Sequence, residues 1–117
     1  MQPRVTDVER LKKQVRKLAA GRVLAGDSAD VCLEFGQMAG CQARVAAGYG
    51  SLSKTPQPAA QDRLIWILDG YAEIHDASDQ VTNISQGEST ILVGGQPYRL
   101  VFPQLTIYVS VEAAGNA

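Results

Sequence analysis

The sequence predicts an all-β fold, a closed barrel or jelly roll with one helix at its N-terminus. Only one segment, near the start of the chain, places apolar residues at helical spacing. After residue 21 the apolar residues fall into about eight short runs separated by turn-forming residues, as in β-strands. Many short strands at regular spacing, with no helix among them, are typical of a barrel or jelly roll.

The helix is expected at about residues 6–20. Thr6 and Glu9 have the spacing of a capping box, in which each side chain satisfies a free backbone N–H group. Gly21 is the expected C-terminal stop. The apolar stripe that would face the body consists of Val8, Leu11, Val15 and Leu18.

The rest of the chain is expected to form strands. The segment 64–68 is apolar on both faces, which is typical of a strand buried on both sides. The segment 51–61 contains Pro56 and Pro58 and is expected to be a loop or a sheet edge. The expected strands are 31–35, 41–47, 64–68, 70–75, 80–84, 89–93, 98–102 and 105–111.

Length and composition indicate one domain. The chain has 117 residues, of which 45% are hydrophobic. We expect a basic helix over 1–22, a barrel over 23–112 and a frayed tail over 113–117. No apolar run approaches the ~20 residues that span a bilayer, and the start lacks the apolar core of a secretory signal. A cytoplasmic protein that does not contact a membrane is therefore expected, with Cys32 and Cys41 as free thiols.

The charge is divided unevenly along the chain. Residues 1–22 hold seven basic and two acidic side chains, a net charge of +5, and the remaining 95 residues carry −6. The basic helix could lie across the acidic body of a second copy, or it could bind nucleic acid or an anionic membrane. Because the helix lacks aromatic residues, we do not expect nucleic acid as a partner.

Four glycines lie at the spacing of two motifs of the cupin superfamily. Gly50 and Gly70 match the glycines of G-x5-H-x-H-x4-E-x6-G, and Gly87 and Gly95 match those of G-x5-P-x-G-x2-H-x3-N. The chain therefore resembles a single-domain cupin, an RmlC-like jelly roll or double-stranded β-helix. The order of strands from 62 to 109 is also loosely similar to cupins of the ethanolamine-utilisation protein Q type.

The same motifs lack every metal ligand of the family. Pro56 and Pro58 stand at the two histidine positions, Arg63 at the glutamate position and Tyr98 at the last histidine position. The resemblance thus implies a degenerate metal site, and we expect neither a metal nor another cofactor. The single histidine, His75, is interpreted as a solvated turn residue, with a general base as the alternative.

The expected ligand site follows from these replacements. If the register holds, Arg63 and Tyr98 lie together in the barrel, where a guanidinium and a phenol favour an anion over a cation. Such a ligand would be small and organic, for example a carboxylate. The alternative is that Arg63 pairs internally with Asp62 or Glu73. The apolar walls of the expected site are Ile65, Ile67, Val93 and Phe102.

Three functions remain open at this point. The first is a metal-free cupin that binds a ligand as a sensor or accessory protein. The second is a metal-independent isomerase or lyase, although no catalytic constellation is present in the sequence. The third is a structural or interaction module. Alternation along 64–68 places Leu64, Trp66 and Leu68 on the outer face, so either the helix or a second subunit is expected to cover them, and a homodimer is expected.

Overall fold

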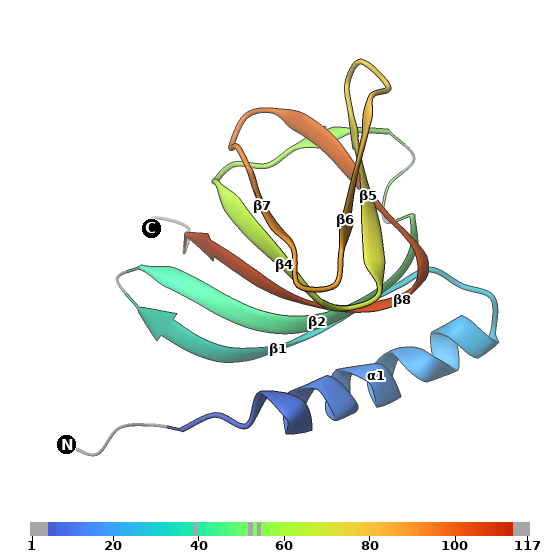
Figure 1. Ribbon diagram of the computed structural model, residues 1–117, viewed down its shortest axis with the longest axis vertical. Coiled ribbons are helices and arrows are strands. Elements are labelled where there is room, and N and C mark those ends of the chain that lie inside the picture. The colour runs from blue at the N-terminus through green and yellow to red at the C-terminus, as the bar shows by residue number, and fades with distance from the viewer. Residues whose placement is uncertain (1–4, 39, 52, 54, 114–117) are drawn as a thin grey trace.

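The computed structural model describes residues 5–38, 40–51, 53 and 55–113 (Figure 1). One helix precedes a succession of strands, and the mostly β architecture confirms the predicted fold class. The elements are α1 (Val8–Leu24), β1 (Ala29–Met38), β2 (Cys41–Ser51), β3 (Gln57–Pro58), β4 (Arg63–Asp69), β5 (Tyr71–Asp76), β6 (Val81–Ser85), β7 (Ser89–Leu92) and β8 (Pro97–Ala113). Of the tail expected over 113–117, Ala113 belongs to β8, and residues 114–117 lie outside the described residues.

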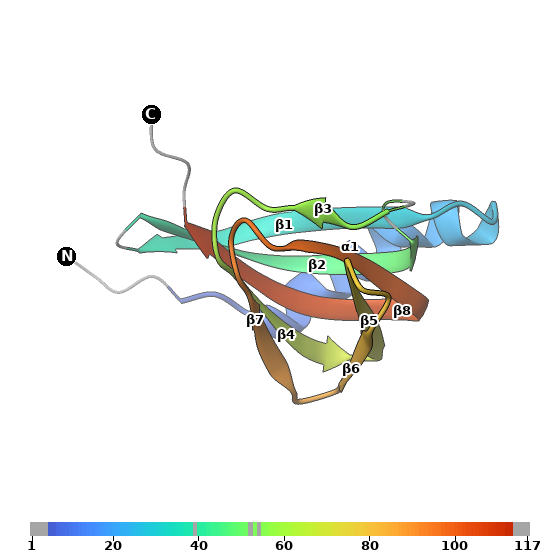
Figure 2. The ribbon, with the colours of Figure 1, turned by 90° about the horizontal axis from the view of Figure 1, so that it is seen from above.

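Strand β8 organises the barrel. Its C-terminal half lies between β2 and β4, and its N-terminal half pairs with β5 and the short β3, all antiparallel. The main sheet has the order β1-β2-β8-β4-β7 and is strongly curved, so that β4 and β7, together with β5 and β6, close over the concave face of β1, β2 and β8 (Figures 1 and 2). The sequence predicted two strands, 98–102 and 105–111, where the structure has one continuous strand.

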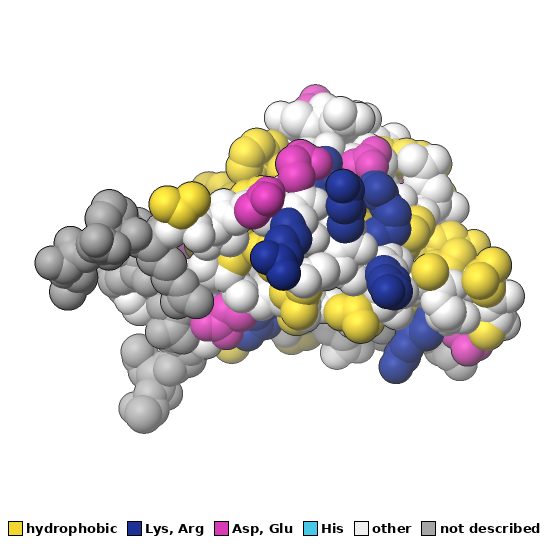
Figure 3. Space-filling view, turned by 90° about the horizontal axis from the view of Figure 1, so that it is seen from below, with side chains coloured by type: hydrophobic (Ala, Val, Ile, Leu, Met, Phe, Trp, Pro, Cys, Tyr) yellow, Lys and Arg dark blue, Asp and Glu magenta, His cyan; other side chains and the backbone are white. Residues whose placement is uncertain are grey.

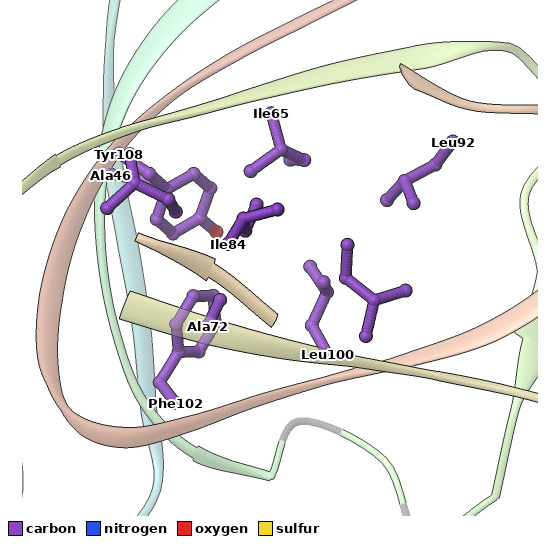
Figure 4. Packing of buried hydrophobic residues seen from close by; sticks show 10 residues of the cluster. Ala46, Ile65, Ala72, Ile84, Leu92, Leu100, Phe102 and Tyr108 are labelled. Atoms are coloured by element: carbon purple, nitrogen blue, oxygen red, sulfur yellow. The ribbon is translucent and has the colours of Figure 1, made fainter. Parts of the chain in front are cut away.

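Alternating side chains divide the core into two clusters. The first fills the barrel interior (Figure 4) and consists of Ala46, Ile65, Ile67, Ala72, Ile74, Ile84, Leu92, Leu100, Phe102 and Tyr108. The second lies between the outer face of the main sheet and α1, and its buried members are Val15, Ala19, Ala29, Val45, Ala47, Ile107 and Val109. The helix therefore acts as an outer layer that covers β1, β2 and β8.

The helix differs from its prediction at both ends. Its N-cap is Asp7, whose side chain accepts a hydrogen bond from the backbone N–H of Arg10, so the Thr6–Glu9 capping box is wrong. It continues through Gly21 to Leu24, since one glycine lowers helix stability without ending a helix that packs on a sheet. Ala19 is buried, whereas Leu18 is 56% exposed and does not join the apolar face. No helix in the described part of the chain is long and apolar enough to cross a membrane.

Candidate functional site

Polar side chains gather on the inner face of the main sheet at one mouth of the barrel. Ile65, Ala46 and Tyr108 face the interior, so residues two positions away on the same strands face it too. Cross-strand pairing sets Arg63 opposite Glu112 and Arg44 opposite Ser110. Strands β2, β8 and β4 thus bring together a polar cluster, the mouth cluster, made of Gln42, Arg44, Arg63, Ser110 and Glu112.

Arg63 is the centre of the mouth cluster. Its Nε donates a hydrogen bond of 2.8 Å to Ser110 Oγ, and its guanidinium carbon lies 6.0 Å from the centre of the Tyr108 ring. Burial by itself lowers the pKa of Arg63, but the nearby Tyr108 and Tyr98 hydroxyls and Glu112 outweigh it, and the net shift is upward. The side chain therefore presents a permanent, half-buried positive charge at the mouth.

The carboxylates considered as partners of Arg63 are engaged elsewhere. Asp62 accepts a hydrogen bond of 2.8 Å from the backbone N–H of Gly94, and Glu73 binds His75 at 3.0 Å. Glu112 forms an ion pair with Arg44, with a nitrogen–oxygen distance of 3.2 Å. Among the described residues no carboxylate lies within ion-pair distance of Arg63, so the predicted pairing with Asp62 or Glu73 is wrong.

Two tyrosines adjoin the guanidinium. Tyr98 is half-buried and packs against the barrel interior, so the structure brings the predicted pair Arg63 and Tyr98 together. Tyr108 is fully buried, and its hydroxyl donates a hydrogen bond of 2.8 Å to Asp30 on β1. Burial raises the pKa of Tyr108 far above its ordinary value, and the Asp30 charge raises it further. Tyr108 is thus an uncharged aromatic side chain that lies beneath the mouth cluster.

The apolar residues expected around the ligand lie at different depths. Ile65, Ile67 and Phe102 are fully buried in the barrel interior. The Phe102 ring stacks on Tyr108, with 5.2 Å between ring centres (Figure 4). Val93 is 54% exposed, so its predicted place in the wall is wrong: Leu92 faces inward, and the following residue points outward. A ligand would contact the outer rim of this interior, because its centre is occupied by packed side chains.

The residues at the mouth do not fit the metal that the resemblance to cupins implies. A guanidinium hydrogen-bonded to Ser110 stands at the glutamate position, and this permanent cation repels a metal ion. A transition metal also needs several His, Cys or carboxylate ligands. Among the described residues, no three such side chains lie close enough together to hold a metal ion.

His75 lies outside this site. Its Nε2 is 3.0 Å from Glu73, and its Nδ1 is 3.2 Å from an Arg99 nitrogen. Arginine can only donate, so Nδ1 accepts this hydrogen bond and Nε2–H donates to Glu73. The side chain is 19% exposed, so the interpretation as a solvated turn residue is wrong. Both ring nitrogens of His75 thus have hydrogen-bond partners on the outer face of β5 and β8, away from Arg63.

Sequence reasoning missed Arg44, Ser110 and Tyr108. Arg44 was overlooked because a charged residue in a strand usually faces solvent. A usable signal existed in the alternation of β8, where 108, 110 and 112 share one face. Placing Arg44 on the same surface additionally requires the register of β2 on β8, which pairs residues 66 positions apart.

Comparisons with known proteins give matches at the level of structure. No family model and no curated protein matches the sequence. A cupin-2 domain protein from Shewanella frigidimarina matches with a TM-score of 0.66 at 14% identity, covering 80% of this chain and 91% of that one. The EutQ protein of Clostridium difficile matches with a TM-score of 0.66 at 11% identity, covering 77% and 71%. A double-stranded β-helix protein from Klebsiella pneumoniae matches with a TM-score of 0.60 at 23% identity, covering 75% of each chain.

Proposed function

We propose that this chain, which has a cupin-type fold, binds a small organic monoanion at the mouth of its barrel. The observation that carries the proposal is Arg63, a half-buried cation without a carboxylate partner among the described residues. Arginine has five N–H donors, and the Nε–H bond to Ser110 uses one of them. The planar fork of the terminal nitrogens suits a carboxylate, which it can grip through two hydrogen bonds.

The charges around Arg63 support a ligand with a single negative charge. Arg44 and Glu112 neutralise each other, and Tyr108 satisfies one oxygen of Asp30. A dianion at Arg63 would be repelled by Glu112, which stands opposite Arg63 in the β4–β8 pair, and displacing this carboxylate from Arg44 would cost part of the binding energy. Because the barrel interior is filled by packed side chains, the ligand must be small. The apolar part of the ligand would contact Tyr98 and the outer rim of the barrel interior.

A thermal-shift screen tests the proposal. Formate, acetate, propionate, butyrate and benzoate are titrated against the wild type, Arg63→Ala and the control Arg99→Ala, which removes an arginine on the other face of the barrel. At a hundredfold excess over Kd, a ligand stabilises the native state by ~2.7 kcal/mol. We expect at least one acid to stabilise the wild type and Arg99→Ala but not Arg63→Ala. The absence of any stabilisation, or its persistence in Arg63→Ala, would refute the proposal.

The other two functions have less support. A metal-independent isomerase or lyase needs an acid–base pair, and His75, the only histidine, is engaged outside the mouth. One matching structure is described as a putative mannose-6-phosphate isomerase from Ralstonia eutropha, at 12% identity, and this supports no activity for the present chain. A purely structural module gives no reason for a half-buried arginine without an acidic partner.

A further inference from the structure

Strand β1 leaves one edge of the main sheet unpaired. It stands at the end of the order β1-β2-β8-β4-β7, and among the described residues it pairs only with β2. The register is regular from Ala29 to Glu34, so every second residue of this stretch directs its backbone N–H and C=O groups away from β2. The stretch contains neither proline nor lysine, the residues with which natural proteins block a free edge. Figure 1 shows β1 at the border of the sheet, next to α1.

A groove lies between α1 and this edge. Its first part has a volume of about 650 Å³ and includes Leu33 of β1. The helix residues that line this part occupy one face, at the spacing i, i+3, i+4 and i+7, and are Gln14, Lys17, Leu18 and Gly21. A second part of about 320 Å³ shares Gln14 and continues to Asp7 at the start of the helix. From Asp7 to Gly21 the helix rises by about 21 Å, which is the length of roughly six residues of extended chain.

Cations without an acidic partner border the groove. Lys17 lines the first part, and Arg10 lines the second. Among the described residues neither of them forms an ion pair, whereas Arg16 pairs with Asp69 of β4. Helix α1 carries six basic residues and one acidic residue, and Lys and Arg side chains gather along it in Figure 3. The groove therefore favours a partner with negative charge.

We propose that a segment of a partner protein adds to the free edge of β1 as an extended strand, with acidic and apolar side chains turned toward α1. The backbone of this strand forms the hydrogen bonds that β1 leaves open, and its side chains provide the specificity. An apolar side chain enters the groove between Leu18 and Leu33. Acidic residues two positions before and after it share the same face and lie about 13 Å apart. Arg10 and Lys17, which are about 10.5 Å apart along the helix axis, can each reach one of them.

A second copy of the chain fits this edge less closely than an acidic segment does. Antiparallel pairing of two β1 edges about a two-fold axis normal to the sheet places both α1 helices on the same face. Each helix has six basic residues against one acidic residue, a net charge of +5, so the two helices repel each other. The groove is also separate from the anion site, because α1 covers the outer face of the main sheet and Arg63 belongs to the mouth cluster on the inner face.

Fluorescence anisotropy with labelled peptides tests the proposal. The probes are fluorescein-labelled heptapeptides of sequence Thr-Glu-Thr-X-Thr-Glu-Thr, with alanine, leucine or phenylalanine at X, titrated with the full chain up to about 1 mM. We expect the leucine and phenylalanine peptides to bind more tightly than the alanine peptide. A matched leucine peptide with lysine in place of both glutamates should not bind.

Substitutions on α1 test the position of the bound strand. Lys17→Glu should raise the Kd of the leucine peptide about tenfold, because an attraction becomes a repulsion of similar size. Leu18→Glu should weaken binding to a similar extent, because it places a charge in the apolar part of the groove. The matched control is Lys13→Glu, the same change of charge at an exposed helix position outside the lining of the groove, and it should change Kd by less than about twofold. Far-UV circular dichroism confirms that each variant is folded.

Amide hydrogen exchange tests the backbone pairing. The bound leucine peptide should slow exchange at alternate residues of β1, and the same peptide with N-methylated backbone amides should not bind. The proposal is overturned if none of the three acidic peptides binds, if the lysine peptide binds equally, or if the protected amides lie outside β1. It is also overturned if the free chain forms a dimer that Leu18→Glu dissociates, since a second copy then occupies the edge.

Discussion

Replacing Gly48 with alanine tests the packing beneath the mouth. Gly48 lies on β2, and the Phe102 ring rests directly on its backbone. A Cβ at this position would lie 2.5, 2.6 and 2.9 Å from three ring carbons, whereas carbon atoms in favourable contact are ~3.5–4.0 Å apart. The ring must therefore move by about 1 Å, although it is fully buried and stacked on Tyr108.

This overpacking is expected to destabilise the protein by about 1–3 kcal/mol. Equilibrium unfolding in urea measures the free energy, and the midpoint of thermal unfolding should fall by about 4 °C for each kcal/mol. The matched control is Gly36→Ala, at a strand glycine where an added Cβ meets nothing within 4 Å. This control should stay within ~0.5 kcal/mol of the wild type.

A double-mutant cycle links the effect to the ring. Phe102→Leu removes ring atoms, so it should cost less stability in the Gly48→Ala background than in the wild type. We expect the two substitutions to differ from additivity by at least ~0.5 kcal/mol. If Gly48→Ala matches the wild type within the error of the unfolding curves, or if the two effects simply add, the described position of Phe102 is wrong.

Three further substitutions test separate contacts. Tyr108→Phe should cost about 1 kcal/mol at pH 7 through its lost hydrogen bond. This deficit should shrink by up to ~1.4 kcal/mol per pH unit above about pH 10, because unfolded tyrosine ionises there. In the native state, burial and then Asp30 raise the pKa of Tyr108. A deficit that does not change in urea titrations from pH 7 to 11 would contradict this. Arg16→Ala breaks the exposed ion pair with Asp69 and should lower the free energy of unfolding by less than ~1 kcal/mol. A loss above ~2 kcal/mol in urea unfolding would show that this pair stabilises the fold more than an exposed ion pair does. Asp7→Ala should lower the free energy of unfolding by about 1 kcal/mol because α1 loses its N-cap. An equal loss in Thr6→Ala would show that Thr6 also caps the helix, as the capping box predicts.

Local periodicity predicted the strands and their faces better than their ends and connections. The alternation along β4 correctly placed Ile65 and Ile67 in the interior and Trp66 outside. The continuity of β8 was not predicted because a proline such as Pro103 usually indicates that a strand ends. Pro103 is exposed and lies opposite the register irregularity between Gly48 and Gly50 of β2. No ladder hydrogen bond is formed at this point, so the missing N–H of proline does not interrupt β8.

The candidate site could be predicted only in part. Arg63 and Tyr98 were expected together from the motif spacing, and the structure places them together. The hydrogen-bond and ion-pair partners of the surrounding carboxylates could not be predicted from the sequence. It depends on contacts between distant segments, such as Asp62 with the backbone of Gly94 and Glu112 with Arg44. These contacts decide that Arg63 lacks an acidic partner within the described chain.

Nuclear magnetic resonance of the Arg63 side chain tests the central claim most directly. The Nε–H group donates to Ser110, so its proton and nitrogen resonances report on the charge at the mouth. In a titration with the acid that gives the largest thermal shift, we predict saturable movement of this resonance with the same Kd. The Nε–H resonance of Arg99, on the other face of the barrel, should stay in place. If the acid binds while the Arg63 resonance does not move, the anion is held elsewhere and the account of the site is contradicted.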